Sequence, residues 1–420
     1  MESKRIVIVG GGFVGINAAK ILGKQTSVEI VLVDRRNHHL FQPLLYQVAV
    51  AGLSPAEIAV PIRSLLSLYK NVKVVLDEIV SVDFKNRYAR GKAGKYEYDY
   101  LILAAGATHN YFGNERWEAN APGLKTIAQA TEIRRRIMTA FENAEIEEDT
   151  TMRRRLLTFV IIGGGPTGVE LAGAIGEMTR HTLSKDFRSI DPKSTRIILV
   201  EAGARILSSF DEGLSSQATR DLERIGVQVW TESTVTNVDS DKVEVGGEVI
   251  SAATVIWAAG VRAAAVGDGL NVNQDKQGRI LVDSSLTIPD YPEVFVAGDQ
   301  AHCLGDDGEP LPSIAPVAIQ QGRYIANSII GIIESKDQAA FRYIDKGQMA
   351  TIGRKKAIVQ TFGMKFSGFF AWITWLFIHI LYLSGFKNRL IVLIQWAYSY
   401  LSFSRGARLI VDRKWQLFEK

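Results

Sequence analysis

The stretch Ile6-Val-Ile-Val-Gly-Gly-Gly-Phe-Val-Gly15 has a counterpart 153 residues later, Val160-Ile-Ile-Gly-Gly-Gly-Pro-Thr-Gly168. In both places a short apolar run leads into the pattern G-x-G-x-x-G. The first glycine permits a tight turn, the second leaves room for a pyrophosphate, and the third lets the following helix pack on the strand. Free N–H groups at the helix start face the phosphates. We call these the first and second glycine turns and predict that each binds a dinucleotide.

A second strand that ends in an acid follows each glycine turn. Residues 29–34 end in Asp34, 19 residues after Gly15, as expected for a carboxylate that accepts hydrogen bonds from an adenosine ribose. Residues 196–201 end in Glu201, 33 residues after Gly168, which predicts an insertion around residues 182–193. The Glu201 carboxylate would repel the 2'-phosphate of NADP, so NADH is predicted over NADPH. The alternative is that both acids only cap the ends of strands and bind no ribose.

Three further apolar segments end in small residues. They are Tyr98–Gly106, Ala253–Gly260 and Glu293–Asp299, and the last ends in Gly298-Asp299. Small residues suit a chain that passes close under a cofactor, although ordinary tight turns would also explain them. Their repetition behind both glycine turns favours the cofactor interpretation.

Composition and cysteine content narrow the class of protein. The 420 residues are 47% hydrophobic and 22% charged, which favours two or three globular domains. The only cysteine, Cys303, excludes a C-x-x-C redox pair and disfavours flavoproteins that relay electrons through two cysteines. Cys303 itself is expected to be an unreactive loop residue. No secretory signal precedes the first strand, so the nucleotide-binding part is expected in the cytoplasm.

Nucleic-acid binding and metal binding are not expected. The arginine runs 134–136 and 153–155 are predicted to be solvated helix faces, because no aromatic interleaving accompanies them. His379 is predicted to be a packed or interfacial imidazole, since no second ligand accompanies it.

The C-terminal region is basic and rich in aromatic residues. Residues 341–420 hold 13 Lys and Arg against 3 Asp and Glu, a net of +10, so the whole-chain charge of +4 leaves −6 for the first 340 residues. Residues 366–386 contain no charged side chain, and neither do residues 390–404. Basic residues, Arg405 among them, flank both runs, so the positive-inside rule gives no consistent spanning topology. Two helices on the membrane surface are expected; a transmembrane hairpin and a buried core or dimer helix are the alternatives.

As an ensemble, these motifs resemble the two-dinucleotide-binding-domain flavoproteins, and within them the type II NADH dehydrogenases. The residues that carry the resemblance are His39-Leu-Phe-Gln-Pro-Leu-Leu-Tyr-Gln47, Gly163-Gly-Gly-Pro-Thr-Gly-Val-Glu-Leu-Ala-Gly173, Val296-Ala-Gly-Asp-Gln-Ala301 and Ala315-Pro-Val-Ala-Ile-Gln-Gln-Gly322. The resemblance implies an α/β fold with two Rossmann-like domains, the NADH domain inserted in the FAD domain, and a C-terminal membrane-associated helical segment. The expected ranges are 1–112 and 263–335 for FAD, 113–262 for NADH, and 336–420 for membrane anchoring and dimerisation.

The resemblance also implies site residues. For FAD they are Gly10, Gly12, Phe13, Gly15, Asp34, Arg35, Pro43, Leu44, Ala105, Gly106, Gly298, Asp299 and Ala318. For NADH they are Gly163, Gly165, Pro166, Thr167, Gly168, Glu170, Glu201, Ala259 and Gly260. The expected catalytic residues are Glu170, near the nicotinamide and flavin rings, and Gln320 and Gln321, near the quinone. Pro316 departs from the family's A-Q-x-A-x-Q motif, and because proline has no side-chain hydrogen bond to offer a quinone carbonyl, the two glutamines take that role.

The implied activity is hydride transfer from NADH to FAD, followed by two-electron reduction of a membrane quinone, ubiquinone or menaquinone, in a respiratory chain without proton pumping. The protein is expected to be a peripheral homodimer on the cytoplasmic face of the membrane. A soluble NADH:ferredoxin-type reductase and a membrane-bound flavoprotein that senses NADH without significant turnover are the alternatives.

Overall fold

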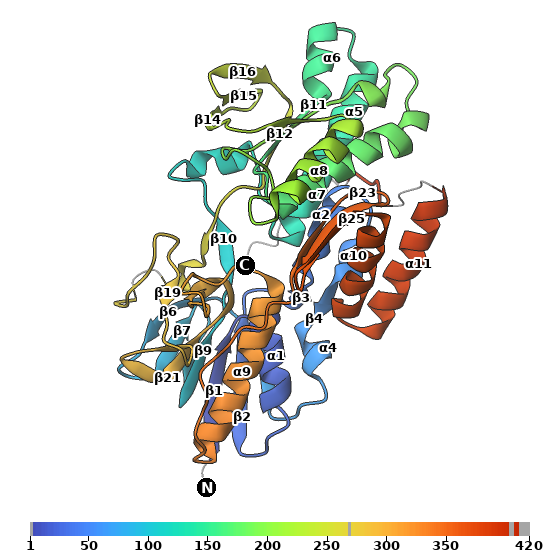
Figure 1. The fold of residues 1–420 in the computed structure, drawn as a ribbon. Helices are drawn as coiled ribbons and strands as arrows, with labels where there is room; N and C mark the ends of the chain where they lie inside the picture. Colours follow the sequence, from blue (N-terminus) through green and yellow to red (C-terminus); the bar gives the residue numbers. More distant parts are fainter. Residues whose placement is uncertain (1–2, 268–269, 403–406, 411–420) are drawn as a thin grey trace. The chain divides into compact units, whose positions relative to one another are not determined.

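The computed structural model describes residues 3–267, 270–402 and 407–410 (Figure 1). Arg405, expected to flank the second uncharged run, lies outside these residues. The chain forms two compact units. Unit 1 comprises residues 1–40, 59–108 and 261–346, and unit 2 comprises residues 41–58, 109–260 and 347–420. These units are defined by contacts within the backbone. They do not test the ranges expected for FAD binding, NADH binding and membrane anchoring, which stay predictions.

A six-stranded sheet of order β20-β21-β9-β1-β2-β5 forms the centre of unit 1. All of its pairings are parallel except that of β20 with β21. Helices α1 and α9 pack together beside this sheet. The elements are β1 Lys4–Val9, α1 Phe13–Leu22, β2 Val28–Asp34, β3 His38–Leu40, β4 Ala59–Pro61, α4 Ile62–Leu66, β5 Val72–Leu76, β6 Ile79–Asp83, β7 Tyr88–Gly91, β8 Lys95–Glu97, β9 Tyr100–Leu103, β18 Val261–Ala263, β19 Ile280–Leu281, β20 Thr287–Ile288, β21 Tyr291–Val296, β22 Ala301–His302 and α9 Ala315–Ile333. Strand β10, Ala107–His109, ends where unit 1 gives way to unit 2.

A four-stranded parallel sheet of order β13-β12-β11-β17 forms the centre of unit 2. Its elements are α2 Leu45–Ala49, α3 Pro55–Ile58, α5 Ile127–Ile146, α6 Thr150–Leu156, β11 Thr158–Ile162, α7 Pro166–Glu177, β12 Arg196–Val200, α8 Glu212–Arg224, β13 Val227–Trp230, β14 Val235–Val238, β15 Lys242–Val245, β16 Glu248–Ser251, β17 Thr254–Trp257, β23 Gln348–Gly353, β24 Lys356–Thr361, β25 Met364–Gly368, α10 Phe369–Tyr382 and α11 Phe386–Ser402. The predicted insertion before β12 is a π-helical turn, Met178–Thr182, followed by two 3-10 turns.

The same three-strand arrangement occurs in both units. In unit 1, Val9 at the end of β1 lies opposite Val33 of β2 and Leu103 of β9. In unit 2, Ile162 at the end of β11 lies opposite Val200 and Trp257. The strands predicted before and after each glycine turn are therefore confirmed to within one or two residues, and the sheets place each acid next to its turn.

The C-terminal segment contains a sheet that the sequence did not predict. Strands β23, β24 and β25 form an antiparallel sheet, and β23 packs on α7. Helices α10 and α11 then follow, as predicted. On α10, Ala371, Trp375 and His379 are buried at four-residue spacing, whereas Phe370 and Phe377 are exposed. No helix in the described part of the chain is long and apolar enough to cross a membrane.

Two expectations about single residues can be compared with the structure. Arg134 was predicted to be solvated, but only 8% of it is exposed, because it lies on the face of α5 that carries Ile133 and Ile137 into the core. This prediction was wrong, since a charge run on a helix cannot reveal which residue faces inward. Cys303 is buried, and burial raises the pKa of its thiol to about 11, which makes the thiol unreactive at neutral pH.

Candidate functional site

The backbone of the first glycine turn requires glycine at two positions and is open at a third. Gly10 has φ +108°, and a Cβ there would lie 2.2 Å from the carbonyl oxygen of Ala104. A Cβ on Gly15 would lie 1.9 Å from the carbonyl oxygen of Gly10, so the close packing of α1 on β1 depends on its absence. Around Gly12, no atom lies within 4 Å of the Cβ position. Gly12 also precedes α1, so open space meets a helix N-terminus there, as a pyrophosphate requires.

The second glycine turn in unit 2 has the same geometry. Gly163 has φ +111°, and its Cβ position lies 2.7 Å from the backbone nitrogen of Ala259. A Cβ on Gly168 would lie 1.9 Å from the carbonyl oxygen of Gly163, whereas Gly165 has no atom within 4 Å. Helix α7 then begins with Pro166 and Thr167. Proline suits this first position, because a helix start has no intrahelical partner for its N–H. The predicted residues Ala259 and Gly260 follow β17, and Gly260 has φ +66°.

The two acids contact the glycine turns in equivalent ways. Asp34 Oδ2 accepts a 2.6 Å hydrogen bond from the backbone nitrogen of Gly11. Glu201 Oε2 accepts a 2.7 Å bond from the nitrogen of Gly164. The other oxygen of each carboxylate accepts a bond from the backbone two residues on. These bonds show that the acids stabilise the turns; each carboxylate oxygen has a second lone pair with which it could accept a ribose hydroxyl.

Most residues predicted for FAD lie together in unit 1. The nitrogen of Ala105 donates a 2.6 Å hydrogen bond to the Gln300 side chain, and Gly298 has φ +68° next to Ala318. The other members in this unit are Gly10, Gly12, Phe13, Gly15, Asp34, Arg35, Gly106 and Asp299. Arg35 pairs with Glu78 at 3.5 Å on the surface. Pro43 and Leu44, by contrast, belong to a 3-10 helix of unit 2, and Leu44 is buried there.

The two predicted catalytic glutamines are engaged with the backbone of unit 1. Gln320 both donates to and accepts from Ile344, at 2.9 and 3.0 Å. Gln321 is buried, and its Oε1 accepts a 2.7 Å bond from the nitrogen of Gly298. Their contact with a quinone stays a prediction. Pro316 occupies the first turn of α9, where a missing N–H costs nothing, which explains why proline is tolerated in the motif.

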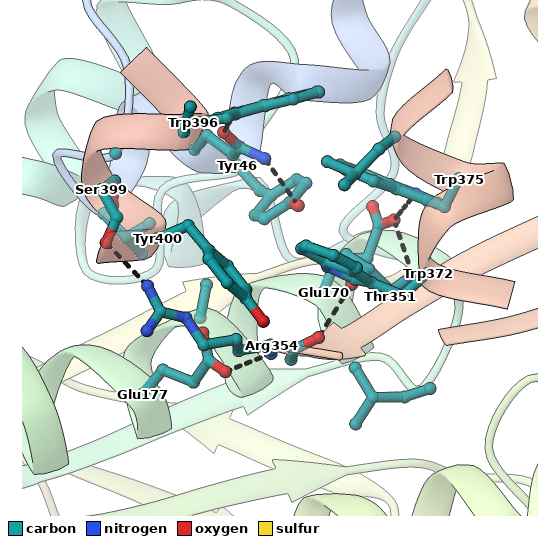
Figure 2. A pocket seen from close by; sticks show the side chains of 18 of the residues that line it. Tyr46, Glu170, Glu177, Thr351, Arg354, Trp372, Trp375, Trp396, Ser399 and Tyr400 are labelled. Carbon is teal, nitrogen blue, oxygen red and sulfur yellow. Dashed lines mark hydrogen bonds between the residues drawn. The ribbon is translucent and has the colours of Figure 1, made fainter. Parts of the chain in front are cut away.

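Unit 2 contains an apolar cavity of about 830 Å³ (Figure 2). It is lined by α2, α7, β23, α10 and α11, and its walls are rich in aromatic residues. The aromatic members are Tyr46, Trp372, Trp375, Phe377, Trp396 and Tyr400. Cavities of this size and composition hold small organic ligands.

Glu170 is a buried acid in this cavity. Its side chain extends from α7, and only 8% of the residue is exposed. Oε1 accepts two hydrogen bonds of 3.3 Å, from the backbone nitrogen of Thr351 and from Nε1 of Trp375. Burial raises the pKa of the Glu170 carboxyl to about 8, and these two bonds offset only part of that effect. Glu170 is therefore mostly protonated at neutral pH.

Hydrogen bonds and ring contacts hold α11 against the cavity. Trp396 Nε1 donates a 2.8 Å bond to Oε1 of Gln47, whose Nε2 donates to the Tyr46 hydroxyl. Arg354 donates to the carbonyl of Ser399 and lies over the Tyr400 ring at 4.5 Å. The motif containing Gln47 was noticed in the sequence, but no local pattern indicated its partner 349 residues away.

Each unit contains a glycine turn with a matched acid, and unit 2 also contains an apolar cavity with a protonatable acid; these are the features of an oxidoreductase that uses two dinucleotides. Residues 4–322 match the family model described as pyridine nucleotide-disulphide oxidoreductase, and the chain belongs to this family. The fold is similar to that of NDH2 from Plasmodium falciparum in complex with NADH, with a TM-score of 0.88, 19% identity, and 98% and 100% of the two chains covered. It is also similar to the sulfide:quinone oxidoreductase of Aquifex aeolicus, with a TM-score of 0.74, 19% identity and 92% of each chain covered.

Sequence comparison identifies a narrower group within this family. The type II NADH:quinone oxidoreductase Ndh of Mycobacterium tuberculosis is 42% identical over 98% of this chain and 91% of its own length. The type II NADH:quinone oxidoreductase NdhA of the same organism is 41% identical over 97% of this chain and 90% of its own length. The Staphylococcus aureus type II NADH:quinone oxidoreductase is 29% identical over 87% and 92%. The chain is a member of the type II NADH:quinone oxidoreductase family, which confirms the resemblance and the α/β fold class predicted from the sequence.

Proposed function

We propose that this protein oxidises NADH and passes two electrons through FAD to a membrane quinone. The observation that carries the proposal is the course of α7 within unit 2. The helix begins at the second glycine turn, and its residues Glu170, Ala174 and Glu177 line the apolar cavity. A single helix thus joins a dinucleotide-binding turn to a cavity suited to a ring with an apolar tail.

The glycine turns fit the two nucleotides. FAD fits the first turn, where Gly12 leaves space for the pyrophosphate and Asp34 lies within reach of a ribose. NADH fits the second, with Gly165 and Glu201 in the same roles. FAD, when bound, would supply the chemistry that accepts a hydride from NADH and then passes the electron pair to the quinone. The negative charge of Glu201 favours NADH over NADPH.

The apolar cavity is the proposed acceptor site. Its indole and phenol rings offer stacking surfaces to a quinone ring, and Glu170 places a protonated carboxyl among them. Reduction of a quinone to a quinol consumes two protons in addition to two electrons, so a nearby acid is useful. Glu170 is the proposed donor of one of these protons.

The outer faces of α10 and α11 are the proposed membrane attachment. On α10, Phe370 is 77% exposed, and Phe377 and Leu381 extend the same apolar stripe. On α11, Phe386 and Ile394 are also exposed. Apolar burial in the headgroup region, together with the net charge of +10 on residues 341–420, supports peripheral binding to the cytoplasmic face. A homodimer, as family resemblance suggests, completes the proposal and is tested by analytical ultracentrifugation in detergent.

The test separates the two half-reactions. The purified protein, reconstituted with FAD, is reduced anaerobically with one equivalent of NADH, and flavin absorbance is followed after rapid mixing with a ubiquinone or menaquinone analogue. Rapid bleaching and then rapid recovery are expected. Failure to retain flavin would refute the proposal. Recovery with ferredoxin but with no quinone would identify the soluble type of reductase, and no recovery with any acceptor would favour an NADH sensor.

A further inference from the structure

The hydrogen bonds of Glu170 distinguish its two oxygens. Both recorded donors, Thr351 N and Trp375 Nε1, point at Oε1 (Figure 2). A protonated carboxyl has one O–H donor and one carbonyl oxygen. The carbonyl oxygen of an acid is a much stronger acceptor than its hydroxyl oxygen, so the two N–H groups favour the form in which Oε1 is the carbonyl oxygen. The acid proton of Glu170 therefore belongs on Oε2.

The indole that makes one of these bonds is held rigidly by its own helix. Trp375 is only 2% exposed, and its ring stacks on the His379 imidazole with centroids 4.0 Å apart. His379 Nδ1 is 2.7 Å from the carbonyl oxygen of Trp375. The indole also contacts the ring of Trp396, with centroids 5.6 Å apart. The position of Nε1 is thus set by α10, one of the two helices whose outer face is proposed to bind the membrane.

In the part of the chain that the structure describes, Glu170 forms no ion pair, and its hydrogen-bond partners are Thr351 and Trp375. The other acidic or basic side chains that line the cavity do not contribute to the raised pKa of Glu170; they are Glu177, His181 and Arg354. The nearby imidazole of His379 is neutral at physiological pH, because burial lowers its pKa to about 4. The Thr351 bond comes from the backbone and is insensitive to side-chain identity. Trp375 is therefore the side chain that controls how Oε1 is engaged.

We propose that Trp375 is a positioning residue that fixes the acid proton of Glu170 on Oε2 and so couples helix α10 to proton delivery in the acceptor cavity. The position of the proton on Oε2 concerns the Glu170 carboxyl alone. The coupling of α10 to proton delivery rests on the proposed quinone reduction. Trp375 does not itself exchange a proton with the acceptor; its N–H holds Glu170 in one protonated form.

The test removes the indole N–H in two ways, and the second of them keeps the ring packing. Trp375→Phe in the full-length FAD-loaded protein removes the N–H, and replacement of Trp375 by benzothienylalanine exchanges only that N–H for sulfur. In pH-difference infrared spectra of the oxidised protein, the Glu170 carboxylic acid band is assigned by its loss in Glu170→Gln. The band is expected at higher frequency in both Trp375 variants, because the carbonyl has lost a donor.

A second measurement follows turnover. The pH midpoint of flavin reoxidation by a quinone analogue is expected to rise by roughly half a pH unit or more in Trp375→Phe, because the lost bond favoured the carboxylate. Flavin reduction by NADH should keep its rate. Trp230→Phe is the matched control. Trp230 ends β13 and does not line the cavity, so this change removes an indole N–H from unit 2 but none from Glu170, and neither the band nor the midpoint should move.

The outcomes separate this inference from the proposed function. An unmoved acid band in a folded Trp375 variant would overturn the positioning role, and so would the same shift in Trp230→Phe. If the band shifts in a protein that reduces no quinone, the position of the Glu170 proton is supported, but the proposed quinone reduction and the coupling to it are refuted. A shifted band with an unshifted midpoint would overturn the coupling to proton delivery.

Discussion

Trp396 of α11 donates a 2.8 Å hydrogen bond to Gln47 of α2 across 349 residues of sequence. The bond attaches the last described helix to unit 2 at the wall of the apolar cavity. Both side chains are half-buried, and a hydrogen bond of this kind contributes about 1 kcal/mol, so it is one of the contacts that hold α11 in place.

We expect Trp396→Phe to loosen α11 without unfolding unit 2. Loss of about 1 kcal/mol corresponds to roughly fivefold faster exchange of the α11 amides through local opening. Hydrogen–deuterium exchange with mass spectrometry measures this. Tyr398→Phe on the exposed side of the same helix is the control and should leave exchange unchanged. Equal protection in Trp396→Phe and Tyr398→Phe would show that the bond contributes nothing.

Two alanine substitutions in the second glycine turn should have different effects, one on NADH binding and the other on stability. Gly165→Ala meets open space, so the melting temperature should stay the same while the KM for NADH rises about tenfold or more, because the methyl group occupies the pyrophosphate position. Gly168→Ala places a Cβ 1.9 Å from the carbonyl oxygen of Gly163 and should destabilise unit 2 by about 1–3 kcal/mol. Thermal melts and steady-state kinetics distinguish the two. A Gly165→Ala variant with an unchanged KM would argue against nucleotide binding at this turn.

The buried acid should make stability depend on pH in a defined window. The folded pKa of Glu170, about 8, lies above the ordinary value of 4.5, so the folded state keeps a proton that the unfolded chain releases. The free energy of unfolding should therefore fall as pH rises from about 4.5 to about 8 and fall no further above that. Glu170→Gln should lack this decline. Denaturant titrations of both proteins at several pH values provide the comparison, and parallel curves would contradict the raised pKa.

Removal of the apolar stripe should release the protein from membranes. Phe370→Ser combined with Phe377→Ser should lower partitioning onto vesicles that contain anionic lipid by about tenfold or more, since each side chain contributes about 1.5–3 kcal/mol when buried. Cosedimentation with vesicles measures this. Leu68→Ser, which changes an 88% exposed leucine of unit 1, is the control. If the double variant and the control sediment alike, α10 is not the attachment site.

The sequence predicted those features whose determinants are local. The strands before and after each glycine turn follow from apolar runs that end in glycine or in an acid, and α10 and α11 follow from two uncharged stretches. The positions of Asp34 and Glu201 beside their turns follow from parallel pairing, which brings strand ends to one edge of a sheet. These parts could be predicted because neighbouring residues determine them.

The acceptor cavity could not be predicted in the same way. The partners of Glu170 are Thr351 and Trp375, 181 and 205 residues further along the chain. Strands β23 to β25 are short and are stabilised by packing on α7 and α10, which no local pattern reveals. Gln320 and Gln321 matched a motif in the sequence. In the structure their side-chain amides form hydrogen bonds with the backbone of Ile344 and Gly298, and no local pattern in the sequence indicates these contacts.

The two glycine turns also align two residues that differ. Asn17 of α1 occupies the position that Glu170 occupies in α7, and its amide donates to the Phe13 carbonyl of its own helix at 2.8 Å. Its oxygen accepts a 3.3 Å bond from Nε of Arg323 on α9, so both partners of this amide belong to unit 1. The acid in α7 instead depends on a backbone and an indole from residues 347–402. A shortened descendant of this chain that discarded those residues would leave an unsupported acid on an apolar helix, so the acid and the C-terminal segment should be gained or lost together in evolution.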